Sequence, residues 1–356
     1  MKIIHVVGTR PNFMKAAPVC HACAKQNITQ LLVHTGQHYD YNMSDIFFQQ
    51  LGLPKPDFNL EVGSGSHAEQ TAMVMMRFEK IVLEYQPDWV MVYGDVNSTV
   101  AATLVCAKLL IPVAHVEAGL RSFDRRMPEE INRLLTDQIA SLLFTPSADG
   151  NENLLREGIA PEKIKLVGNV MIDTLIKFLP STQEISLTNY PREFVLITLH
   201  RPSNVDDETR LEQIISSLKR ISQQIPLIFP IHPRTRQRLA NRSISLDDAP
   251  QLHLTEPLSY LEFLALEQKA KAVITDSGGI QEETTYLSIP CFTLRENTER
   301  PITVQVGSNM LIGFDYPHLE HELEAVLAGQ AKTSSVPPLW DGKAAERIAE
   351  IMVSLA

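Results

Sequence analysis

Short apolar runs alternate with amphipathic segments along the whole chain, and this pattern predicts an α/β protein. In the first half, apolar runs of strand length lie at residues 3–7, 31–35, 89–93, 112–116 and 142–145. Segments with a helical spacing of apolar positions lie between them, for example at 99–110 and 128–140. Buried strands that alternate with helices are typical of βαβ units, in which helices cover both faces of a parallel sheet.

The alternation begins again after residues 165–167, and the polar segment 181–191 indicates a loop. Further strand-like runs lie at residues 194–200, 227–232, 272–275 and 291–294. We therefore predict two Rossmann-like doubly wound domains, residues 1–167 and 168–356, that face each other across a cleft.

The end of the chain predicts one more helix, over residues 342–355. Asp341 is placed as its N-cap. One helical face carries the apolar side chains Ala345, Ile348, Met352 and Leu355. Because such a stripe needs a surface to cover, we expect this helix to pack back across the N-terminal domain.

Composition narrows the class of protein. The chain has 356 residues, 44% of them hydrophobic, and a formal net charge of −10, which argues against a general nucleic-acid-binding surface. No apolar run approaches the roughly 18 residues of a membrane span. The N-terminal apolar run reaches Arg10 too soon for a signal peptide. Four cysteines do not form a disulfide framework, so we expect a cytoplasmic protein with no membrane or nucleic-acid partner.

The sequence favours an enzyme without a metal or a redox cofactor. Cys20 and Cys23 form a CxxC pair, but the pair lies inside a predicted helix, where two small buried residues are the favoured interpretation over a redox or zinc site. There is no second CxxC pair and no acidic metal-binding motif. No GxGxxG motif follows a predicted strand, which disfavours a tightly held nicotinamide.

Reactive residues concentrate where predicted strands of the first half end, which is where open α/β sheets bind ligands. Arg10 and Lys15 follow the first strand and favour anion binding over a solvated surface turn. Asp95 follows the strand 89–93, at the rim of the cleft or as a helix cap. Glu117 ends an apolar strand, and burial is expected to raise its pKa toward that of a general base.

A helix that starts at residue 128 follows. Glu129 and Arg133 are four residues apart on it, which allows either an exposed ion pair or an arginine that orients Glu129 in a pocket.

The second half contains a predicted phosphate site. The strand 272–275 runs through Ser277, Gly278 and Gly279 directly into a helix, whose free N–H groups and dipole favour an anion. A helix cap without a ligand is the alternative. Glu283, farther along this helix, can accept hydrogen bonds from ribose hydroxyls. Further charge for a diphosphate can come from Arg295 and Arg300, and the two histidines that end strands are His200 and His232.

Together these segments resemble the non-hydrolysing UDP-N-acetylglucosamine 2-epimerases over nearly the whole chain. The matching stretches are GTRPNFMK, HTGQHYD, YGDVNST, HVEAGLRSFDRRMPEEINR, DSGGIQEE and RENTERP. The resemblance implies a glycosyltransferase-B-like fold with the active site between the domains, a homodimer, and interconversion of UDP-N-acetylglucosamine and UDP-N-acetylmannosamine for cell-envelope polysaccharide synthesis. It places family functional positions at Arg10, Lys15, Asp95, Glu117, Glu129, Arg133, His200, His232, Ser277, Glu283 and Arg300.

The implied reaction has a chemical constraint. The hydrogen on sugar C2 is not next to a carbonyl group, so simple deprotonation is too difficult. Elimination of UDP across C1–C2 gives a 2-acetamidoglucal, and readdition with protonation from the opposite face completes the inversion. This route needs cations on the departing diphosphate and carboxylates near C2. We therefore expect Glu117 or Asp95 to move the C2 proton and His200 to assist diphosphate departure.

Some residues of this chain differ from the family pattern, and these differences leave alternatives for its regulation and its substrate. Family members that a second substrate molecule activates typically carry Gln and Arg where this chain aligns Asp40 and Glu69, so we expect weak or absent substrate activation. The nearest alternative substrate is a UDP-2,3-diacetamido uronic acid. A glycosyltransferase on the same fold and a non-catalytic nucleotide-sugar sensor are more distant alternatives.

Overall fold

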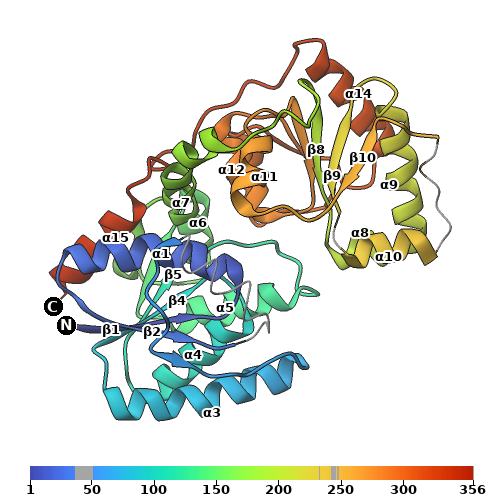
Figure 1. The fold of residues 1–356 in the computed structure, drawn as a ribbon. Coiled ribbons are helices and arrows are strands. Elements are labelled where there is room, and N and C mark those ends of the chain that lie inside the picture. The colour runs from blue at the N-terminus through green and yellow to red at the C-terminus, as the bar shows by residue number, and fades with distance from the viewer. Residues whose placement is uncertain (37–50, 232, 242–245, 247, 356) are drawn as a thin grey trace. The chain divides into compact units, whose positions relative to one another are not determined.

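The computed structural model describes residues 1–36, 51–231, 233–241, 246 and 248–355. The chain divides into two compact units, Met1–Thr174 with Pro338–Ala356 (unit 1) and Leu175–Pro337 (unit 2). Each unit contains one parallel β-sheet with helices on both faces (Figure 1). The predicted α/β class with two doubly wound sheets is confirmed. Within the described residues, no helix combines the length and the apolar content needed to cross a bilayer.

Unit 1 has a seven-stranded sheet in the order β3-β2-β1-β4-β5-β6-β7. The strand order reverses next to β1 and β4, which makes the carboxyl ends of these two strands the topological switch point where doubly wound sheets bind ligands. The elements are β1 (Lys2–Val7), α1 (Arg10–Lys25), β2 (Thr29–His34), β3 (Phe58–Asn59), α3 (His67–Tyr85), β4 (Trp89–Tyr93), α4 (Asn97–Lys108), β5 (Val113–Val116), α5 (Pro128–Ile139), β6 (Leu142–Thr145), α6 (Ala148–Arg156), η1 (Pro161–Lys163), β7 (Ile164–Leu166) and α15 (Ala344–Ser354).

Unit 2 repeats the plan with six strands in the order β10-β9-β8-β11-β12-β13, so its switch point lies at β8 and β11. Val195 and Ile197 of β8 enter one apolar core, and Phe194 and Leu196 enter the core on the opposite face. After α7 (Val170–Phe178), which spans the boundary, the elements are η2 (Leu179–Glu184), β8 (Val195–Thr198), α8 (Pro202–Val205), α9 (Glu208–Ile221), β9 (Leu227–Pro230), α10 (Pro233–Asn241), β10 (Leu252–Thr255), α11 (Tyr260–Glu267), β11 (Ala272–Thr275), α12 (Gly278–Leu287), β12 (Cys291–Thr293), α13 (Pro301–Gln305), β13 (Asn309–Leu311) and α14 (Tyr316–Leu327).

Four strands have no counterpart in the sequence prediction, and all four are edge strands. They are β3 and β7 in unit 1 and β10 and β13 in unit 2. Each is short and only partly buried. An edge strand lacks a neighbour on one side, so its sequence does not need the continuous apolar run by which the inner strands were found.

The boundary between the units lies after Thr174, later than the predicted boundary at residue 167, because the start of α7 is bonded into unit 1. The Thr174 hydroxyl donates to the Met14 carbonyl (2.6 Å), and Asp173 accepts hydrogen bonds from the amides of Ala344 (3.2 Å) and Ala345 (2.7 Å). These contacts also seat α15, which packs beside α1 (Figure 1).

The cap of the last helix differs from the prediction. The N-cap residue is Lys343, not Asp341, and the first amides of α15 are bonded by Asp173 instead. Asp341 forms an ion pair with Arg347. Leu355 follows the helix and is 49% exposed, so the apolar stripe ends before it.

We predict that Asp173 makes stability depend on pH. Burial raises the pKa of the Asp173 carboxyl to about 6, above its unfolded value of 3.8. The folded state therefore binds this proton more tightly, and the resulting stabilisation is lost as pH rises through about 6. Relative to Asp173→Asn, the wild-type free energy of unfolding should fall by about 2 kcal/mol between pH 4 and pH 7. Urea denaturation at several pH values measures this difference.

Asp341→Asn is the control of opposite sign. The hydrogen bond from Arg347 lowers the pKa of Asp341, so the wild type should gain stability over this variant as pH rises. A difference between wild type and Asp173→Asn that stays constant with pH would contradict the prediction.

Candidate active site

In unit 1, the loops that follow β1 and β4 are joined by one buried side chain, Asn12. Its Oδ1 accepts hydrogen bonds from the amides of Gly8 and Thr9, both at 3.1 Å, and its Nδ2 donates to the carbonyl of Tyr93 (2.8 Å). Asn12 also completes a capping box with Thr9 at the start of α1. The two strand ends of the switch point are therefore held together directly.

Glu117 follows β5 and is the most constrained acidic residue at this edge of the sheet. Its φ of 73° lies in the left-handed region, which costs about 1–2 kcal/mol for a residue with a side chain. The amides of Glu117 (3.1 Å) and Ala118 (3.0 Å) both donate to the carbonyl of Phe144, which holds this backbone in place. The strain is stored at a strand end, as is common at functional sites.

The Glu117 carboxylate forms a buried ion pair with the Lys15 ammonium. Both residues are only 6% exposed, so each charge depends on the other for compensation. Gly94 makes this approach possible, because an added Cβ would lie 2.8 Å from Lys15 Nζ and 3.1 Å from Glu117 Oε2.

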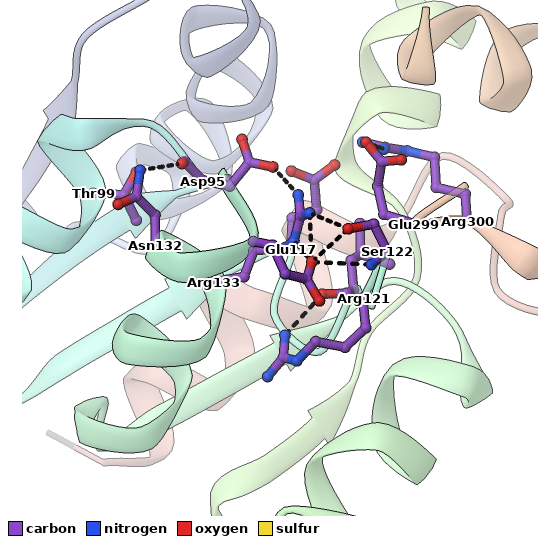
Figure 2. Close-up of polar contacts among 12 residues, drawn as sticks. Asp95, Thr99, Glu117, Arg121, Ser122, Asn132, Arg133, Glu299 and Arg300 are labelled. Atoms are coloured by element: carbon purple, nitrogen blue, oxygen red, sulfur yellow. Dashed lines mark hydrogen bonds and ion pairs between the residues drawn. The ribbon is translucent and has the colours of Figure 1, made fainter. Parts of the chain in front are cut away.

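A second acidic group, Asp95, follows β4 and forms an ion pair with Arg133 of α5 (Figure 2). Arg133 also bonds Glu130 through Nη2 (2.6 Å) and Nε (2.9 Å). Glu130 accepts further hydrogen bonds from the amides of Ser122 and Phe123, both at 3.0 Å. The Glu130 carboxylate is therefore fully engaged, whereas the Asp95 side chain remains 28% exposed.

Beneath these groups, a buried polar network supports the loop that carries Glu117. His115 bonds Asp137 through Nδ1 (2.6 Å) and the carbonyl of Gly94 through Nε2 (2.8 Å). Asp137 also forms an ion pair with Arg121 (2.7 Å) and accepts a hydrogen bond from the amide of Gly119 (3.1 Å). Burial acts to raise the pKa of Asp137, but His115 and Arg121 outweigh it and hold the pKa below its usual range.

In unit 2, α12 begins directly after β11 with two glycines. Ser277 is the N-cap residue but makes no side-chain capping hydrogen bond. An added Cβ at Gly278 would lie 2.6 Å from Arg300 Nη1, so glycine lets the guanidinium approach the helix start. Arg300 is held there by Glu282 (2.8 Å). The backbone N–H groups of a first helical turn, the positive end of the helix dipole and an arginine together favour an anion.

His200 follows β8 beside this helix start and is oriented by Asp276. The Asp276 carboxylate lies 3.1 Å from His200 Nδ1 and accepts hydrogen bonds from the amides of His200 and Arg201. Burial acts to raise the pKa of Asp276, but the contacts with His200, Arg201 and Asn204 keep that pKa low. The His200 side chain is 51% exposed, so part of the imidazole is open to a ligand.

Three arginines of unit 2 gather around the buried carboxylate of Glu299. Its partners are Arg295 at 2.7 Å, Arg300 at 3.4 Å and Arg201 at 3.6 Å. Arg295 also lines a pocket of about 660 Å³ with Ile312, and burial lowers its pKa. This arrangement concentrates positive charge next to the start of α12.

Comparison with known proteins gives these sites a context. Residues 21–353 match the family model described as UDP-N-acetylglucosamine 2-epimerase. The chain is 45% identical to the UDP-N-acetylglucosamine 2-epimerase of Methanocaldococcus jannaschii, over 99% of each chain. This chain belongs to the UDP-N-acetylglucosamine 2-epimerase family.

Other relatives define the breadth of the family. The UDP-2,3-diacetamido-2,3-dideoxy-D-glucuronate 2-epimerase of Pseudomonas aeruginosa is 41% identical over the full length of both chains. The crystal structure of the Methanocaldococcus jannaschii UDP-GlcNAc 2-epimerase in complex with UDP-GlcNAc and UDP superposes with a TM-score of 0.90, at 44% identity, over 99% of this chain and all of that chain. The resemblance inferred from the sequence motifs is confirmed at the level of the family.

The structure brings most of the predicted family positions together within their own units. Unit 1 contains Lys15, Asp95, Glu117 and Arg133, and unit 2 contains His200, Ser277, Gly278, Gly279, Glu283 and Arg300. Arg10 is exposed at the first position of α1. Glu283 is 3% exposed and accepts a hydrogen bond from the Tyr260 hydroxyl (2.9 Å). His232 lies outside the described residues.

Two alternatives from the sequence are resolved. The i,i+4 pairing of Glu129 with Arg133 is wrong, because Arg133 pairs with Glu130 and Asp95, and Glu129 is half-buried beside them. Asp95 does not cap α4, whose N-cap residue is Val96.

Sequence reasoning did not single out Glu130, Asp276, Glu299 or Arg201. Asp276 and Glu299 lie inside the quoted motifs, next to predicted residues. Local sequence could not reveal their pairing, because Asp276 and His200 are 76 residues apart and Glu299 and Arg201 are about 100 residues apart.

Glu69 and Asp40 carried the expectation about substrate activation. Glu69 completes the capping box of α3, where its carboxylate accepts the amide of Ser66 (2.9 Å). This gives Glu69 a local structural role. Asp40 lies outside the described residues, so the expectation stays a prediction.

We predict that Glu130 is required for stability. Burial acts to raise its pKa, but the Ser122 amide and Arg133 outweigh it and hold the pKa low, so its stabilisation is present at neutral pH and lost as pH falls. Glu130→Gln should lower the free energy of unfolding at pH 7 by about 2 kcal/mol, because two amides and an arginine lose a charged acceptor. Denaturant titration measures the loss.

Glu129→Gln is the matched control one position earlier on α5. Because Glu129 does not pair with Arg133, this variant should stay within about 0.5 kcal/mol of wild type. Equal losses in both variants would contradict the assignment of Glu130 as the buried partner.

Proposed function

We propose that this protein interconverts UDP-N-acetylglucosamine and UDP-N-acetylmannosamine by inverting the configuration at sugar C2. The observation that carries the proposal is the strained, buried Glu117 carboxylate beside Lys15, with Asp95 at the end of the neighbouring strand. Sites that shift protons place acidic groups in such partly desolvated strand ends. The proposal also extends to this chain the activity for which its relatives are named.

The chemistry proceeds by elimination and readdition. A base removes the proton from C2, the C1–O bond to the diphosphate breaks, and the electron pair leaves with UDP to give a 2-acetamidoglucal. UDP then attacks C1 again while C2 receives a proton on the opposite face. Two carboxyl groups suit this sequence, because one accepts a proton and another delivers one.

We assign the C2 proton to Glu117 or Asp95. Lys15 pairs with Glu117 and Arg133 pairs with Asp95, so each carboxylate is held in place to accept a proton. Glu129, half-buried at the positive end of α5, is the third carboxylate that we assign to this region.

Unit 2 would hold the UDP. The diphosphate would bind at the start of α12, which consists of Ser277, Gly278 and Gly279, and to the nearby Arg300. Glu283 would accept hydrogen bonds from the ribose hydroxyls. His200, oriented by Asp276, would stabilise the negative charge that develops on the departing diphosphate. Arg10, exposed at the start of α1, stays a predicted anion-binding residue of unit 1.

A UDP-2,3-diacetamido uronic acid is the alternative substrate, because a relative at 41% identity is named for it. Such a sugar carries a carboxylate that needs a cation. In unit 1 the buried cations Lys15, Arg121 and Arg133 are each already paired with a carboxylate, which favours the uncharged hexosamine. A cytoplasmic location, a role in cell-envelope polysaccharide synthesis and weak substrate activation remain predictions.

We predict that inversion proceeds with solvent hydrogen at C2. Incubation of the purified protein with UDP-N-acetylglucosamine in deuterated water should give the epimer with deuterium at C2, because the proton leaves the sugar in the elimination step. A proton spectrum records epimer and isotope together. Retention of the original hydrogen would exclude elimination, and faster turnover of the diacetamido uronate would favour the alternative substrate.

The same assay tests the carboxylates. Glu117→Gln or Asp95→Asn should reduce turnover by about 100-fold or more, because a general base is lost. Glu152→Gln, an exposed carboxylate on α6, is the control and should keep wild-type turnover. If both site variants kept normal turnover, the assignment of the C2 proton would be wrong.

We also propose that the protein is a homodimer that associates through α5 and α3. Ile131 (39%), Leu135 (47%) and Ile139 (39%) are exposed at successive i,i+4 positions of α5, so they form one apolar stripe. Met76 (63%) and Leu83 (57%) are exposed on α3. Exposed apolar side chains gathered on a helix mark protein interfaces, and a second copy is the simplest partner.

Leu135→Glu is expected to halve the molar mass measured by light scattering, because the charge would be buried without a partner at the interface. Leu155→Glu, a leucine of similar exposure (49%) on α6, should leave the mass unchanged. A wild-type protein with the mass of a monomer would contradict the dimer.

A further inference from the structure

Two buried carboxyl groups are neighbours, one at the end of α11 and one within α12, and the functional assignments above use only one of them. Glu267, the last residue of α11, is fully buried, and Glu283 of α12 is 3% exposed. Tyr260 and Glu267 are seven residues apart on α11, two helical turns, so they lie on the same face of that helix. The Tyr260 hydroxyl donates to Glu283 Oε1 (2.9 Å).

Neither carboxyl oxygen of Glu267 receives a hydrogen bond from a described donor. Its neighbouring polar group is the Glu283 carboxyl, which lies within hydrogen-bonding reach. Two ionised carboxylates have only acceptor atoms and repel each other, and an unpaired buried charge is very costly. A proton on one of them removes both penalties, since the acid can then donate to the other carboxylate.

The surroundings decide which group keeps the proton. Burial and the adjacent Glu283 raise the pKa of Glu267 well above its usual value. Burial raises the pKa of Glu283 only to about 7, because the Tyr260 hydrogen bond opposes it. The other titratable groups that act on this pair are Glu282, which is paired with Arg300, and Cys291, whose pKa burial raises to about 12. Glu283 has the Tyr260 hydroxyl as a donor, whereas neither oxygen of Glu267 has a donor among the described residues, so Glu267 is the group that keeps the proton.

We propose that Glu267 is a positioning residue of the nucleotide site: as a neutral acid it donates a hydrogen bond to Glu283 and, with Tyr260, fixes the direction in which the Glu283 carboxylate accepts ribose hydroxyls. A carboxylate has about four acceptor positions, so two internal donors leave acceptors for the ligand. The ligand class is a ribonucleoside diphosphate. This inference rests on the proposed function, in which Glu283 binds the ribose of UDP.

The test compares UDP with 2′,3′-dideoxy-UDP by calorimetry on the full-length wild type, Glu267→Gln and Glu267→Leu. Glu267→Leu removes the donor and should weaken UDP binding by about tenfold, which is the effect of losing one hydrogen bond. The affinity for dideoxy-UDP should stay the same, because this nucleotide has no ribose hydroxyls for Glu283 to bind. Glu267→Gln restores a donor through its amide and should keep UDP affinity within about threefold. Equal losses for the two nucleotides would reduce Glu267 to a structural residue and overturn the inference.

Infrared spectroscopy gives an independent readout that does not depend on the leucine variant folding. At about pH 9, above the pKa of Glu283 and of Asp173, the wild type should show the C=O stretch of a protonated carboxylic acid, and Glu267→Gln should lack it. Absence of this band in the wild type would also overturn the inference. A wild-type protein that binds no UDP would end the proposed function itself, whereas UDP binding with equal losses for both nucleotides contradicts only the role of Glu267.

Discussion

A charged group that leaves water at the end of a strand must find a partner, and this requirement shapes both units. Glu117 is buried against Lys15, and Asp276 is buried against His200 and two backbone amides. An unpaired charge in either place would cost several kcal/mol. The loops after the central strands are therefore folded around these pairs, and the polar groups stand in fixed positions before any ligand arrives. Such preorganisation is the main source of electrostatic catalysis.

The exposed fraction of a charged side chain distinguishes the groups that stabilise the fold from the groups that can still contact a ligand. Glu130 and Asp137 have their oxygens occupied by amides and arginines within unit 1. Asp95 and His200 belong to the same kind of pair but keep 28% and 51% of their side chains exposed. A group that is oriented by a buried partner and still open on one side can reach a substrate without losing its geometry.

The two units apply one architecture to different chemistry. In unit 1 the switch point of the sheet gathers carboxylates, which suits hydrogen transfer at carbon. In unit 2 it gathers arginines and a glycine-rich helix start, which suits an anion. In the proposed function, a carboxylate that binds ribose lies near a diphosphate, where its negative charge opposes binding. A proton held on Glu267 limits the Glu267–Glu283 pair to a single charge and so lowers this cost.

The inner strands, the two doubly wound sheets and the strand ends where reactive residues gather could be predicted from the sequence, because burial on both faces and helical periodicity are local properties of the chain. The edge strands β3, β7, β10 and β13 could not be predicted in this way, since they need no continuous apolar run. Which charges pair became known from the folded structure. Arg133 pairs with Glu130 and Asp95 and not with Glu129. Asp173 accepts a hydrogen bond from the first amide of α15, 171 residues away. Such choices depend on distances between segments that are remote in sequence, and no local pattern encodes them.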